Sequence, residues 1–123
     1  MKNNKIYSDA PLYVDGTSLL GEVSRMVKNM TRDNKHAFGY EMIGLLKEVV
    51  TNFSLSFKEN DKQKKLEYAI ASSKKLEEFE IHLTVVKNVD AIGKNQYVNI
   101  HQHLGNMLTQ IYGWTESLRS KKG

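Results

Sequence analysis

The feature that most constrains this chain is the spacing of its apolar side chains, which recur every three or four residues in four separate segments. This spacing places the apolar side chains along one face of a helix. In the first segment, for example, Leu19, Val23 and Met26 fall on one stripe. The four segments predict helices over about 17–31, 36–58, 61–89 and 94–119.

Polar connections of only a few residues separate the four predicted helices. Short connections force helices that follow one another in the chain to run antiparallel. The expected fold is therefore all-α, an antiparallel up-down-up-down four-helix bundle over 15–120. We expect an extended lead segment over 1–14, which contains the only proline, Pro11, and a short tail over 121–123.

Composition supports one folded domain and excludes several kinds of protein. The 123 residues are 40% hydrophobic and 26% charged, as in folded proteins rather than disordered or membrane proteins. No apolar run reaches the length of a signal peptide or the roughly 18 residues of a membrane span, so we expect a cytoplasmic location and no membrane partner. Because the chain has no cysteine, it has no disulfide, thiolate metal site or cysteine nucleophile.

The sequence offers little for catalysis or metal binding. The di-iron pattern of some helical bundles needs Glu-x-x-His motifs, which are absent here. Glu78 and His82 share a helix face, but no second pair matches them, and His101 and His103 point in nearly opposite directions on a helix. No phosphate-binding loop, dinucleotide motif or nucleophile elbow is found. We therefore expect no catalytic residue, metal or cofactor. The alternative is an enzyme whose pocket combines one of these three histidines with a carboxylate.

Glycines inside the predicted helices are unusual, because each costs about 1 kcal/mol relative to alanine. They indicate either close helix approach or frayed and kinked helix segments. These glycines are Gly21, Gly39, Gly44, Gly105 and Gly113. Trp114 lies near the apolar stripe of the fourth helix, which favours packing in the core or at a subunit interface over an exposed position. Gly105, Gly113 and Trp114 are therefore the candidate packing or interface residues.

Basic side chains form two groups when the helices are placed in the predicted topology. Lysine and arginine outnumber acids by 18 to 14, a net charge of +4 that permits nucleic-acid binding without requiring it. One end would hold Arg25, Lys28, Arg32, Lys35, Lys87 and Lys94. The other would hold Lys58, Lys62, Lys64, Lys65 and Arg119, with Lys121 and Lys122. Either group could contact phosphates. Charge alone favours simple solvation of the helices, since Glu59, Asp61, Glu67 and Glu116 dilute the second group.

Several short segments resemble a known family. They are GKNQY at 93–97, LGNML at 104–108, IYGW at 111–114 and RDNKHAFG at 32–39. Together they resemble the four-helix-bundle proteins encoded by intervening sequences in ribosomal RNA genes. The similarity is greatest to one branch, the accessory variability determinant protein of diversity-generating retroelements. The third predicted helix departs from that branch, because His82 and Thr84 stand where a more basic stretch is expected.

This resemblance implies a non-enzymatic accessory protein. It implies a homopentameric barrel that binds the reverse transcriptase of the retroelement and contacts its RNA and DNA. Assembly would repeat each modest basic patch around a ring, and such contacts carry no sequence preference. The alternative hypothesis is an interaction module of the intervening-sequence type that has another protein partner and no role with nucleic acid.

Overall fold

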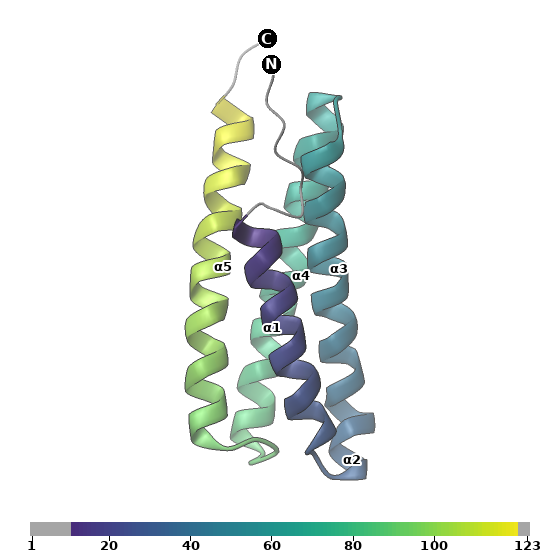
Figure 1. Ribbon diagram of the computed structural model, residues 1–123, viewed down its shortest axis with the longest axis vertical. Coiled ribbons are helices and arrows are strands. Elements are labelled where there is room, and N and C mark those ends of the chain that lie inside the picture. The colour runs from purple at the N-terminus through teal and green to yellow at the C-terminus, as the bar shows by residue number, and fades with distance from the viewer. Residues whose placement is uncertain (1–10, 121–123) are drawn as a thin grey trace.

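The computed structural model describes residues 11–120, and this part of the chain is helical and contains no strand. The expectation of an all-α protein is confirmed. The elements are α1 (Pro11–Lys28), α2 (Arg32–Asn34), the π-helical segment η2 (Lys35–Gly39), α3 (Tyr40–Lys58), α4 (Lys62–Asn88) and α5 (Lys94–Ser120). Figure 1 shows the four long helices lying side by side.

Helix α1 begins at Pro11, well before the predicted start at 17. The expected extended conformation over 11–14 is therefore wrong, and the remainder of the predicted lead and the tail 121–123 lie outside the described residues. Proline suits the first position of a helix, where its missing N–H would have no intrahelical acceptor. Leu12 then extends the stripe of Leu19 and Val23, since all three are buried. The first turn of α1 therefore packs against the core through Leu12.

The break between α1 and α3 is shorter than predicted. The Thr31 hydroxyl caps the next helix by accepting a hydrogen bond from the Asn34 N–H at 3.2 Å. From Arg32 to Lys58 the chain stays helical, with the π-helical turn at Lys35–Gly39. Gly39 in this turn lies against α1, because a Cβ there would stand 2.6 Å from Val27 Cγ1. Among the five glycines of the predicted helices, Gly39 is the one for which close approach is the correct interpretation.

Helices α4 and α5 match the predicted ranges to within one residue at each end. Asp61 caps α4 by accepting a hydrogen bond from the Lys64 N–H at 2.9 Å. Asp90 follows α4 with a φ of 59°, and the Ala91 N–H donates to the Val86 carbonyl at 2.8 Å. This left-handed residue and six-to-one hydrogen bond are the usual way for a helix to stop.

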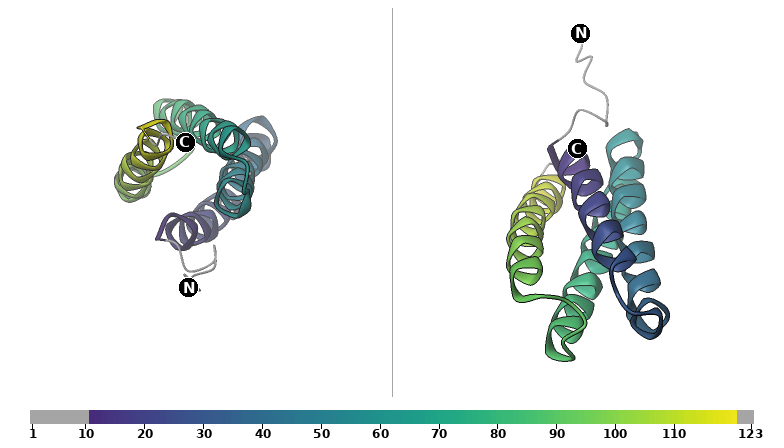
Figure 2. Two further views of the ribbon diagram at one scale, coloured as in Figure 1. Left: turned by 90° about the horizontal axis from the view of Figure 1, so that it is seen from above. Right: turned by 60° about the horizontal axis from the view of Figure 1, so that its bottom comes forward.

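The core is drawn from all four long helices. Helix α1 packs against α3 and α5, α3 against α4, and α4 against α5, and Figure 2 shows this order from above. The largest fully buried side chains are Leu19, Val23, Val27, Met42, Leu46, Val49, Leu76, Phe79, Leu83, Leu104, Met107 and Ile111. No helix within residues 11–120 is both long and apolar enough to cross a membrane.

The two ends of the molecule differ in the connections that they hold. One end, here called the Asp90 end, holds the connections 29–31 and 89–93 and the first turns of α3 and α5 (Figure 1, bottom). The opposite end, here called the Asp61 end, holds the turn 59–61 and the end of α5 (Figure 1, top), and α1 begins below it. The candidate residues are described below by these ends.

Candidate nucleic-acid interface

The structure brings the predicted basic side chains of the first group to the Asp90 end from α1, α2, η2, α4 and α5. Arg25, Lys28, Arg32, Lys87 and Lys94 are exposed, and Lys35 is half-buried. Arg25, Lys28 and Arg32 do not follow one helix, because Lys28 ends α1 and Arg32 begins α2. These cations therefore surround the end of the molecule rather than following one helix.

An aromatic pair lies beside these cations. The Tyr97 and His101 rings stack with centroids 5.3 Å apart and an interplanar angle of 29°. Lys87 Nζ lies 4.9 Å from the centroid of the Tyr97 ring, a cation–π contact that joins the last turn of α4 to the first turn of α5. Aromatic faces next to lysines are the chemistry that sequence-tolerant binding of single strands uses.

A polar cavity of about 180 Å³ opens between α1 and α5 at the Asp90 end. Each helix presents residues spaced by three and four, so each contributes one continuous stripe. The lining residues are Glu22, Arg25, Met26 and Asn29 from α1 and Gln96, Asn99 and Ile100 from α5. Met26 and Ile100 are buried and form the apolar floor. No pattern in the sequence predicts this cavity, because its two walls are some seventy positions apart in the chain.

Glu22 is the only acid in this wall. Its Oε1 atom is buried and has no hydrogen-bond partner, and its Oε2 atom lies 3.8 Å from His103 Nε2. Buried polar atoms are nearly always hydrogen-bonded in folded proteins. The Glu22 side chain as a whole is 37% exposed, so this buried atom belongs to a partly solvated carboxylate.

At the Asp61 end, Lys65 makes contacts inside the chain. Its ammonium donates hydrogen bonds to the carbonyls of Ser56 at 2.8 Å and Phe57 at 3.0 Å, at the carboxyl end of α3. It also lies 5.5 Å from the centroid of the Trp114 ring. Favourable interaction of a cation with the last carbonyls of a helix explains this position. Of the predicted second group, Lys58, Lys62, Lys64 and Arg119 are exposed.

Trp114 packs partly buried against the core. Its ring stacks on Phe57 with centroids 6.3 Å apart, and its Nε1–H donates to the Ser56 hydroxyl at 2.9 Å. A mostly apolar cavity of about 360 Å³ adjoins this cluster and is lined by Pro11, Leu12, Phe53, Phe57, Gln110, Gly113, Trp114 and Ser117. A Cβ at Gly105 or Gly113 would meet no atom within 4 Å, so neither glycine marks close helix approach in the monomer.

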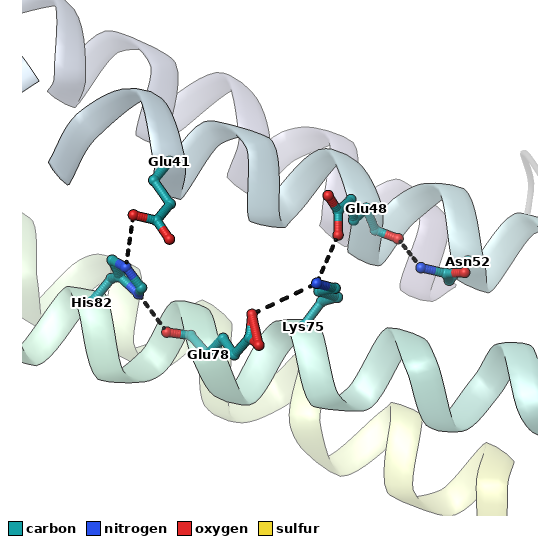
Figure 3. Close-up of polar contacts among 6 residues, drawn as sticks. All are labelled: Glu41, Glu48, Asn52, Lys75, Glu78 and His82. Atoms are coloured by element: carbon teal, nitrogen blue, oxygen red, sulfur yellow. Dashed lines mark hydrogen bonds and ion pairs between the residues drawn. The ribbon is translucent and has the colours of Figure 1, made fainter. Parts of the chain in front are cut away.

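The histidines considered for a catalytic pocket have three different neighbours. His82 Nε2 lies 3.4 Å from a Glu41 oxygen in the seam between α3 and α4 (Figure 3). His101 stacks on Tyr97, and His103 faces Glu22. No group of three or more potential metal ligands occurs within residues 11–120. The structure thus gives each histidine a separate structural contact.

The same seam carries an ion-pair cluster. Lys75 Nζ lies 3.0 Å from Glu48 and 3.8 Å from Glu78, as Figure 3 shows. The hydrogen bond to Glu48, with the negative charges of Glu48 and Glu78, raises the pKa of Lys75. This cluster is exposed and lies along the middle of the molecule, so it contributes to the packing of α3 on α4 and not to either basic end.

No family model matches the chain, and no curated protein is similar to it.

Two of the four segments on which the expected resemblance rests have a common location. Residues 32–39 form α2 and η2, and residues 93–97 lie at the start of α5. Both therefore lie at the Asp90 end, beside the polar cavity and the Tyr97–His101 pair. The segments 104–108 and 111–114 lie farther along α5, and the second of them contains Trp114.

Proposed function

We propose that this chain is an antiparallel up-down-up-down four-helix bundle that binds RNA or DNA through the Asp90 end and catalyses no reaction. The observation that carries the proposal is the gathering of basic side chains from α1, α2, η2, α4 and α5 at that end, next to an aromatic pair. Lysines and arginines supply most of the sequence-independent affinity for phosphates. The non-helical connections 29–31, 59–61 and 89–93, of three to five residues each, support the bundle topology.

We propose further that the bundle assembles into a homo-oligomer, a pentamer by resemblance, in the cytoplasm. Exposed apolar side chains support a surface for a second copy: Ile81, Val85 and Val89 follow one another at spacings of four along α4, and Ile81 is 64% exposed. Exposed apolar side chains that line up in this way are typical of interaction sites. Assembly would multiply the charge of each Asp90 end.

By resemblance, the protein partner is the reverse transcriptase of a diversity-generating retroelement, and the chain is its accessory protein. The resemblance of residues 32–39 and 93–97 supports this part of the proposal, and their shared position gives it a physical site. The second candidate function is an interaction module with a different protein partner. The exposed apolar side chains of α4 favour that alternative, because they can pack against a protein partner without any contact to nucleic acid.

Two measurements test the proposal. Fluorescence anisotropy with labelled RNA and DNA of mixed sequence should show binding at low salt that weakens steeply as salt rises. Light scattering should show a mass that is a multiple of the 14.1 kDa chain. Absence of binding at low salt would favour the interaction module, and a monomer at all concentrations would remove the oligomer from the proposal. Co-purification with a reverse transcriptase encoded beside the chain would test the partner.

A further inference from the structure

A short stack of rings lies on α5 near the Asp90 end. Tyr97 packs partly buried against the core, and His101 stacks on it with ring centroids 5.3 Å apart. Lys87 Nζ, 4.9 Å from the Tyr97 centroid, holds the inner ring from α4. His101 itself is exposed. The stack therefore has an anchored inner ring and an outer ring in contact with solvent.

The next position along this face of α5 is a glycine. Tyr97, His101 and Gly105 follow one another at spacings of four, which places them one above the other on the helix. A helical side chain covers the turn before its own Cα, so a side chain at 105 would lie over the His101 ring. A Cβ at Gly105 would meet no side chain within 4 Å, apart from its chain neighbours, among residues 11–120. The side of His101 that faces Gly105 is therefore open.

We infer that this open side of His101 stacks against an unpaired base of single-stranded RNA or DNA. The inference rests on the proposed binding of nucleic acid and adds to it the form of nucleic acid that the protein prefers. Every base has a flat ring face, so this contact needs an unpaired base but tolerates any sequence. The bases of a duplex are already paired and stacked on one another, and their ring faces cannot reach His101.

The charges along α5 indicate how the strand runs. Lys94 precedes His101 by seven positions, about two helical turns, and so lies on the same side of the helix. Toward the other end of α5, Glu77 accepts a hydrogen bond from the Tyr112 hydroxyl, and the negative charge of Glu80 also acts on that hydroxyl. Phosphates are repelled by these carboxylates and attracted by Lys94. A strand whose base stacks on His101 therefore directs its backbone toward the Asp90 end.

The experiment compares three labelled probes of equal length by fluorescence anisotropy at low salt: a single strand of mixed sequence, the same strand without its bases, and a duplex. The strand without bases keeps every phosphate, so the first two affinities differ only by what the bases contribute. Wild-type protein should bind the complete strand about tenfold more tightly, since stacking of one base on an aromatic side chain gives a factor of this order. RNA and DNA strands should show the same ratio, because the contact uses the base and not the sugar.

Substitutions of His101 then locate the stack. H101A should lower the affinity for the complete strand about tenfold and leave the other two probes unchanged. H101Y keeps a ring at this position and should keep the wild-type affinities. H103A is the matched control, because His103 lies two positions away on the same helix and faces Glu22 instead of the stack. It should bind all three probes as the wild type does.

Gly105 allows an independent test. G105F places a ring of the protein itself on the open side of His101, so it should lower the affinity for the complete strand about tenfold and spare the other two probes. G105A is its control, since a Cβ alone meets no clash and covers little of the ring. It should bind as the wild type does. Both positions are exposed, so these variants should also keep the circular dichroism of the wild type.

The outcomes separate this inference from the proposed function. If no probe binds at low salt, the proposed function fails together with the inference. If the complete strand and the strand without bases bind equally, nucleic-acid binding stands and the stacking site is wrong. An equal loss for all three probes in H101A would make His101 a phosphate contact and overturn the inference. A changed molecular mass of G105F with unchanged strand affinity would show that this face meets a second copy of the chain, which would also overturn it.

Discussion

The Ser56 hydroxyl connects three helices at the Asp61 end. It donates to the Lys65 carbonyl at 2.7 Å and accepts from Trp114 Nε1 at 2.9 Å, and Ser56 itself is fully buried. S56A should lower the free energy of unfolding by about 1–3 kcal/mol, because it leaves the indole N–H of Trp114 without its acceptor. Urea unfolding followed by circular dichroism measures this loss.

A second serine on α3 provides the control for that substitution. The Ser54 hydroxyl donates only to the Val50 carbonyl one turn earlier. S54A should therefore change the stability by no more than about 0.5 kcal/mol. Equal losses in the two variants would mean that the bond to Trp114 contributes nothing specific.

Tyr112 provides a prediction about pH. The hydrogen bond that its hydroxyl donates to the Glu77 carboxylate, with smaller effects of burial and of the Glu77 and Glu80 charges, raises the pKa of Tyr112 to about 12. Because the pKa is raised above its ordinary value near 10, this contact stabilises the fold fully below pH 10 and is lost as the pH rises toward 12. Tyrosine ionisation followed by difference absorbance should show that the tyrosine with the highest pKa is Tyr112. In E77Q that pKa should return toward 10.

Glu78 is the control for this titration, because it pairs with Lys75 and is not among the carboxylates that raise the pKa of Tyr112. E78Q should leave the high titration unchanged, and Y112F should abolish it, which assigns the signal among the six tyrosines. A high titration that persists in E77Q would contradict the proposed cause.

Single residues show which contacts sequence reasoning can foresee. The helical stripe correctly favoured packing for Trp114, because that inference needs only neighbours on its own helix. The acceptor of its indole N–H, Ser56, stands 58 positions away, and no local pattern connects the two. Lys65 is likewise a candidate phosphate contact by its place in the second basic group, although its ammonium donates to carbonyls at the end of α3.

At the scale of the helices, Gly39 and Gly44 offer a matched comparison. A Cβ at Gly39 would stand 2.6 Å from Val27 Cγ1, whereas one at Gly44 would meet nothing within 4 Å. G39A should lower stability by about 1–3 kcal/mol, because the buried Val27 must move. G44A should raise it by about 0.5–1 kcal/mol through better helix propensity. Chemical unfolding of the two variants checks both signs, and a stabilised G39A would refute the close contact of η2 with α1.

The elements themselves were largely predictable, because long apolar stripes specify helices wherever they occur. The ranges of α4 and α5 were predicted to within one residue. The start of α1 was missed because Pro11 was interpreted as part of an extended segment, although proline is also acceptable in the first turn. The π-helical turn at Lys35–Gly39 could not be foreseen, since it depends on how Gly39 meets Val27 on another helix.

At the scale of the whole molecule, the position of charges follows from topology, but cavities do not. Grouping Arg25, Lys87 and Lys94 at one end required only the order of helices and short connections. The polar cavity depends on the packing of α1 beside α5, the first and last helices of the described chain, and on side chains that stop short of filling the space between them. The spacing of residues along the sequence therefore does not predict this cavity.

The two basic ends can be compared directly by removing three charges from each. R25Q/K28Q/R32Q acts at the Asp90 end, and K58Q/K62Q/K64Q acts at the Asp61 end. We expect the first variant to bind RNA more weakly and to lower the slope of log affinity against log salt by about 2, as for three lost phosphate contacts with a single strand. The second should lose less, because Glu59, Asp61, Glu67 and Glu116 already offset those lysines. Fluorescence anisotropy over a series of salt concentrations measures both slopes, and a larger loss in the second variant would move the binding surface to the Asp61 end.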